Sequence, residues 1–160
     1  MGIKRLDNPK NQKVIKFSIV LFVLILAVII GIFFFFYQMY HKDMKKLTDF
    51  VASYEKFDQA ISDFSISRTD DLEGKTSNAL LELKTNSTFR ISSLIRNEGE
   101  AMKLALEIAD LSEKEFDSLK AYKEAIQNKN ANLDRFSKQY DDLANNRKSA
   151  YARFQELARE

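Results

Sequence analysis

The segment from Phe17 to Tyr37, FSIVLFVLILAVIIGIFFFFY, contains no charged residue and constrains the fold more than any other part of the chain. At a rise of about 1.5 Å per residue, a helix of this length spans roughly 30 Å, the thickness of the hydrocarbon core of a bilayer. Bulky residues follow it and leave no Ala-x-Ala-like cleavage site, so we expect an uncleaved signal anchor over residues 17–40. Tyr37 and Tyr40 are placed to lie at the level of the lipid headgroups.

Basic residues flank this segment unequally, and their distribution predicts its orientation. Residues 1–16 contain five basic residues and one acidic residue. The residues after the segment carry both signs: Lys42, Asp43, Lys45, Lys46 and Asp49. Because basic residues are retained on the cytoplasmic side during insertion, we expect a basic cytoplasmic tail over 1–16 and an extracytoplasmic domain over 41–160. One N-terminal anchor with an outer helical domain is similar to the arrangement of many bacterial envelope proteins, so a bacterial cell membrane is the expected location.

The composition argues against several classes of function. The chain has no cysteine and one histidine, His41, which excludes disulfides, thiolate metal sites and histidine clusters. It also has no glycine-rich phosphate loop, so we expect no enzyme activity, no metal and no cofactor. Residues 17–160 hold 20 basic and 22 acidic residues, which gives no basic stripe for nucleic acid. No small-molecule substrate is indicated, and the carboxylates between residues 98 and 117 alternate with lysines as on a solvated helix face.

After the anchor, the sequence predicts helices throughout. There is no proline, and only Gly74 and Gly99 interrupt a composition rich in Ala, Leu, Lys, Glu and Asp. Apolar residues spaced 3 and 4 apart predict a first outer helix over 43–66 that continues the anchor: Leu47, Phe50, Tyr54, Phe57, Ile61 and Phe64. A capping-box pattern at residues 70–73 predicts a second helix over 71–127. The asparagine-rich residues 128–132 predict a turn, and the same spacing predicts a third helix over 133–159.

The expected fold is therefore all-α, with a single transmembrane helix that continues into an elongated antiparallel helical bundle or coiled-coil rod of about three outer helices. The second helix would be about 85 Å long, roughly twice the length of its neighbours. An alternative breaks it at Ser112 and gives a compact bundle of three or four helices. In the rod, apolar helix edges would remain exposed, which favours association with a second copy or with another helical membrane or envelope protein.

The apolar residues spaced 3 and 4 apart form a seam along one face of each outer helix. Polar residues at positions of this seam are the candidate interaction or register residues. Arg90 and Asn97 lie on the seam of the second helix and Arg147 on that of the third. A buried guanidinium requires a carboxylate, so such residues can fix register or partner choice; the alternative is that they face water. Within the anchor, Ala27 and Gly31 form a small-xxx-small pair that would allow two anchors to approach closely, although small residues are common in such helices.

These observations predict a single-pass, membrane-anchored helical interaction or scaffolding protein without catalytic activity. Its expected partners are the lipid bilayer and either a second copy or another helical protein. A sensory or signal-transmitting module is the alternative, because the helix that leaves the membrane has no break before residue 66. A tail of 16 residues offers no output domain, so signalling would act through a partner protein.

Overall fold

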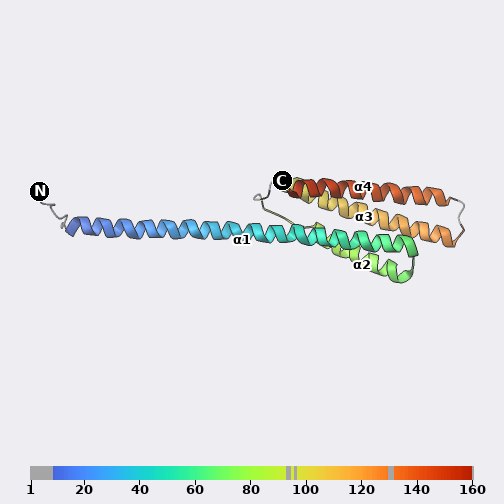
Figure 1. Ribbon diagram of the computed structural model, residues 1–160, viewed down its shortest axis with the longest axis horizontal. Helices are drawn as coiled ribbons and strands as arrows, with labels where there is room; N and C mark the ends of the chain where they lie inside the picture. The colour runs from blue at the N-terminus through green and yellow to red at the C-terminus, as the bar shows by residue number, and fades with distance from the viewer. Residues whose placement is uncertain (1–8, 93–94, 96, 130–131, 160) are drawn as a thin grey trace. The chain divides into compact units, whose positions relative to one another are not determined.

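The computed structural model describes the backbone of residues 9–92, 95, 97–129 and 132–159, and the side chains from residue 17 to residue 158 within these ranges. Four helices make up the described part, which contains no strand: α1 (Pro9–Ser67), α2 (Asp70–Ser87), α3 (Glu98–Gln127) and α4 (Leu133–Arg159) (Figure 1). The all-helical expectation is confirmed. The chain divides into two units, residues 1–41 and 42–160. Much of the expected basic tail, residues 1–8, lies outside the described residues.

The N-terminal unit consists of the first part of α1. The helix begins at Pro9, whose fixed φ angle and missing N–H suit the first turn. Every side chain from Phe17 to Gln38 is exposed. Among the described residues, this helix is the one that is long and apolar enough to cross a membrane.

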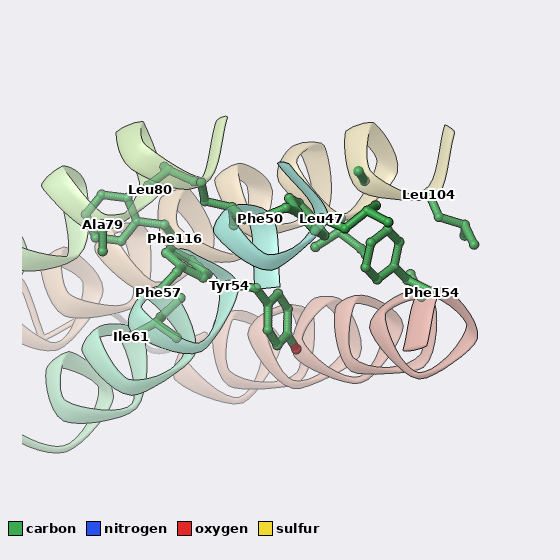
Figure 2. Packing of buried hydrophobic residues seen from close by; sticks show 14 of the residues in the cluster. Leu47, Phe50, Tyr54, Phe57, Ile61, Ala79, Leu80, Leu104, Phe116 and Phe154 are labelled. Atoms are coloured by element: carbon green, nitrogen blue, oxygen red, sulfur yellow. The ribbon is translucent and has the colours of Figure 1, made fainter. Parts of the chain in front are cut away.

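The C-terminal unit is built around one hydrophobic core to which all four helices contribute (Figure 2). The six residues that the 3–4 spacing placed on one face of the first outer helix belong to this core. All are at most 7% exposed: Leu47, Phe50, Tyr54, Phe57, Ile61 and Phe64. Phe50 meets Phe154 of α4 edge to face, with ring centroids 4.9 Å apart, and Phe89 at 5.8 Å. Such edge-to-face pairs are favourable arrangements of aromatic rings.

The expectation of one helix over 71–127 is wrong. The helix ends at Ser87, and α3 begins at Glu98, so the C-terminal unit contains α2, α3, α4 and the last part of α1. The alternative break at Ser112 is also wrong, because Ser112 is buried inside α3 and donates a hydrogen bond to the Ile108 carbonyl at 2.7 Å. Tertiary contacts of residues 89–92 override the helical propensity of this stretch, as described below.

Each helix runs antiparallel to the one before it. Contacts between α1 and α2 pair Ala60 with Thr76 and, further from the turn, Asp49 with Asn86. The turn between them contains Arg68 with φ 49°, and the N-cap of α2 is Thr69, one residue before the expected Asp70; its hydroxyl accepts a bond from the Leu72 N–H at 3.4 Å. Figure 1 shows α3 and α4 side by side.

The expected turn at residues 128–132 begins at Asn128 and Lys129, while residues 130–131 lie outside the described residues. The helix that follows, α4, has the same bounds as the helix expected over 133–159.

Candidate functional site

A group of three charged side chains lies inside the C-terminal unit and joins three helices. Arg147 of α4 is 1% exposed. Its Nε donates to Oε2 of Glu115 on α3, and its Nη2 donates to Oε1 of Glu115 at 3.4 Å and to Oδ1 of Asp58 on α1 at 2.7 Å. We call these three residues the ion cluster. The sequence requirement that a buried guanidinium finds a carboxylate is met here twice.

Aromatic rings enclose the guanidinium of Arg147. Its central carbon lies 5.1 Å from the centroid of the Tyr54 ring and 5.4 Å from that of Phe57. The Tyr54 ring in turn stacks on Tyr151 of α4, with centroids 3.5 Å apart. A planar guanidinium suits such a site because it can bind a carboxylate through its edge and an aromatic ring through its face.

Hydrogen bonds within the ion cluster oppose the cost of burying the charges of Glu115 and Arg147. Burial raises the pKa of Glu115, and its hydrogen bond with Arg147 opposes that increase. Burial also disfavours the charge of Arg147, but hydrogen bonds to Glu115 and Asp58 outweigh this effect and raise its pKa. Since Glu115 is 1% exposed and Asp58 44% exposed, the cluster reaches solvent only on the α1 side. Replacement of both members of such a buried pair by apolar residues is often neutral for stability, whereas removal of one member leaves an uncompensated buried charge.

Arg90 and Asn97 lie apart from this cluster, in the connection between α2 and α3. The Arg90 side chain is exposed rather than buried at a helix seam, and its carbonyl accepts a hydrogen bond from the Lys46 ammonium. Asn97 is exposed and has φ 59°, a left-handed conformation that asparagine tolerates. Its carbonyl accepts bonds from the N–H groups of Glu100 and Ala101, both at 3.0 Å, so Asn97 is the N-cap of α3.

A second polar site, not predicted from the sequence, joins Ser92 of this connection to α1. Asp43 is 4% exposed, and its Oδ2 accepts bonds from the backbone N–H of Ser92 at 2.8 Å and from the Ser92 hydroxyl at 2.6 Å. Its Oδ1 accepts from Lys46 Nζ at 2.8 Å. Burial opposes ionisation of Asp43, but these hydrogen bonds prevail and lower its pKa. The available signal was its position four residues before Leu47, on the seam face of the helix.

A third polar contact joins the end of α3 to the start of α2. Lys123 is 9% exposed, and its Nζ lies 2.6 Å from Asp70 Oδ1 and 2.8 Å from Glu73 Oε2. Hydrogen bonds to Asp70 and Glu73 raise the pKa of Lys123. Acidic residues in the first turn of α2 also interact favourably with the positive end of its helix dipole. The same carboxylates therefore stabilise α2 and bind α3.

In the N-terminal unit, Ala27 and Gly31 lie on an open helix surface. A Cβ added to Gly31 would meet no atom within 4 Å. The described residues contain no group of three or more acidic, histidine or cysteine side chains arranged to hold a metal ion. No protein-family model, curated protein or solved structure matches this chain.

Proposed function

We propose that this chain is a single-pass, membrane-anchored helical protein that works by interaction or scaffolding and carries out no chemistry. The observation that carries the proposal is the contrast between the two units. The C-terminal unit buries its apolar seam within itself, whereas every side chain from Phe17 to Gln38 is exposed. Apolar surface of that extent is unfavourable in water and favourable in a bilayer. In this proposal residues 17–40 span the membrane, with the N-terminus cytoplasmic and an antiparallel helical bundle outside the cytoplasm.

The anchor is also the part of the chain where we place self-association. Apolar residues of the expected rod are largely covered within the C-terminal unit, since Ile91, Ala105 and Ala109 are all buried. Exposed edges of a rod therefore no longer argue for a partner. Ala27 and Gly31 remain a place where two anchor helices can approach closely, because no atom of the described residues lies within 4 Å of a Cβ added to Gly31.

Sedimentation equilibrium of the full chain in density-matched detergent tests this proposal. We expect a monomer–dimer equilibrium that depends on the ratio of protein to detergent. Gly31→Leu should shift the equilibrium to monomer, whereas the matched control Ile30→Leu, one residue away on the same exposed helix, should leave it unchanged. A wild-type monomer at every ratio would exclude self-association through the anchor. A chain that stays in solution without detergent or lipid would exclude the anchor itself.

A signal-transmitting role is the second candidate. It is favoured by α1, which continues without a break from Pro9 to Ser67 and contributes Asp58 to the ion cluster. In this case a partner on the cytoplasmic side would supply the output. Loss of a cellular response on substitution of Asp58, with unchanged dimerisation, would favour signalling over scaffolding.

A further inference from the structure

The connection between α2 and α3 presents a basic side chain beside the part of α1 that follows the anchor. Residues 89–92 have no regular secondary structure. Phe89 and Ile91 pack on the core, and Arg90, which lies between them, is exposed. Phe89 and Ile91 therefore attach this segment to the core, while the Arg90 side chain remains accessible from outside the unit.

Three contacts hold this connection at the level of residues 43–46. Asp43 binds the N–H and hydroxyl of Ser92, at 2.8 and 2.6 Å, and the Lys46 ammonium donates to the carbonyl of Arg90. Because all of these residues belong to the C-terminal unit, Arg90 is fixed relative to Lys42 and Lys45 whatever the orientation of the anchor. The side chains of Lys42 and Lys45 are also exposed, and none of the ion pairs among the described residues includes Lys42, Lys45 or Arg90.

If residues 17–40 span the membrane, as proposed above, the number of residues after Tyr40 sets the distance of Lys42, Lys45 and Arg90 from the bilayer. If Tyr40 lies at the interface, helical rise puts Lys42 about 3 Å and Lys46 about 9 Å further along the helix. The headgroup layer is roughly 5–8 Å thick on each side of a bilayer. Electrostatic attraction to an anionic surface acts over a Debye length of about 8 Å at physiological salt.

We propose that Lys42, Lys45 and Arg90 form a binding surface for the headgroups of anionic lipids, which we call the lipid-facing triad. Asp43, the acidic residue nearest to them in sequence, is occupied by Lys46 and Ser92 and is therefore withdrawn from the surface. The triad holds residues 89–92 against the bilayer and limits the tilt of the C-terminal unit. This role requires anionic lipid in the leaflet that faces the C-terminal unit. Each basic residue close to an anionic surface strengthens the contact about fivefold.

Spin-label accessibility of the full chain in nanodiscs tests the proposal. The sequence has no cysteine, so Thr88→Cys gives one label in the connection and Ser67→Cys gives one label at the other end of the unit, at the end of α1. Collision of each label with a nickel chelate attached to lipid headgroups reports its distance from the bilayer. We expect the Thr88 label to collide more often in nanodiscs that contain about 30% of the anionic lipid phosphatidylglycerol than in nanodiscs of pure phosphatidylcholine. The collision rate of the Ser67 label should not depend on lipid charge.

Variants that remove the charges of the triad distinguish its contribution to membrane contact from that of the anchor alone. Arg90→Gln should lower the ratio of membrane-bound to unbound residues 89–92 about fivefold. Addition of Lys42→Gln and Lys45→Gln should make the collision rate of the Thr88 label independent of lipid charge. The matched control is Arg135→Gln with Lys138→Gln, which removes two exposed charges near the start of α4. Equal collision rates in the two lipid compositions, or no change in the triple variant, would overturn the proposal while the anchor stands. Failure of the chain to enter nanodiscs would overturn both.

Discussion

Replacement of Arg147 by methionine should destabilise the C-terminal unit more than any other single charge removal on α4. Arg147 and Glu115 are each 1% exposed, so the substitution leaves a carboxylate buried without its cation. Removal of one partner from a buried pair costs about 3–5 kcal/mol, which corresponds to a decrease in Tm of roughly 10–20 °C for a unit of this size. Part of that cost can be recovered by protonation, because burial already raises the pKa of Glu115.

The sign of the pH dependence follows from this protonation. Without Arg147, the pKa of Glu115 in the folded state should lie further above its value in the unfolded chain. The penalty is then fully present above the folded pKa and decreases as pH falls toward the unfolded pKa, because the folded state takes up a proton. The difference in stability between wild type and Arg147→Met should therefore be smaller at pH 5 than at pH 8. Thermal unfolding of the full chain in detergent, followed by far-UV circular dichroism, measures it.

A matched ion pair on the same two helices provides the control. Arg153 of α4 and Glu100 of α3 are 3.7 Å apart and are 58% and 54% exposed. Pairs as exposed as this contribute about 0–1 kcal/mol, so Arg153→Met should change Tm by only a few degrees. The double variant Glu115→Gln with Arg147→Met should recover much of the loss, since neither buried charge remains. If Arg147→Met is no more harmful than Arg153→Met, the ion cluster is not a structural element of this fold.

Three further substitutions test other contacts by unfolding of the full chain. Asp43→Asn should lower stability at neutral pH and remove a pH dependence: the folded pKa of Asp43 is lowered, so its contribution is present above the unfolded pKa of about 3.9 and is lost as pH falls below it. Parallel wild-type and variant curves down to pH 3 would contradict this assignment. Phe50→Ala should cost about 3–5 kcal/mol, because Phe50 is 0% exposed and touches Phe89 and Phe154; a loss below 1 kcal/mol would contradict the central place given to this ring. Thr76→Val should cost about 0.5–1.5 kcal/mol, because the Thr76 hydroxyl lies 3.0 Å from the Ala60 carbonyl of α1 and 2.8 Å from the Leu72 carbonyl; unchanged stability would show that this contact is dispensable.

Periodicity was a reliable guide where one face of a helix is buried. The spacing of Leu47, Phe50 and Tyr54 predicted the buried side of α1, and the spacing from Leu133 onward predicted α4. A repeat of 3 and 4 residues is a local property that survives any arrangement of the neighbours. The long apolar helix that the segment after Phe17 predicted is also present, because 18 or more apolar residues without a charge are typical of a membrane-spanning helix.

The break between α2 and α3 could not be read from the sequence because its cause is not local. Residues 88–97 include no proline, and their apolar residues continue the helical pattern. The chain leaves the helix where Asp43, 49 residues earlier, binds Ser92, and where Phe89 reaches Phe50. Arg90 was assigned to a seam for the same reason: once the helix ends, its side chain no longer follows the 3.6-residue period.

Arg147 illustrates what sequence could and could not supply about the ion cluster. Its seam position indicated a buried guanidinium in need of a carboxylate, but the partners, Asp58 and Glu115, lie 89 and 32 residues away. Both are acidic residues in amphipathic helices rich in charge, and nothing local distinguishes them from solvated neighbours. The partner choice depends on how α1, α3 and α4 align, which is a tertiary property.

Cysteine accessibility in intact cells tests the central claim of a membrane anchor with an external helical unit most directly. The chain has no cysteine, so Asn8→Cys and Lys129→Cys each provide a single site, one on either side of residues 17–40. A membrane-impermeant maleimide should label the Lys129 site in intact bacterial cells and the Asn8 site only after the membrane is permeabilised. Labelling of both sites in intact cells, or recovery of the chain in the soluble fraction after alkaline extraction, would contradict the single-pass account; labelling of Asn8 alone would reverse its orientation.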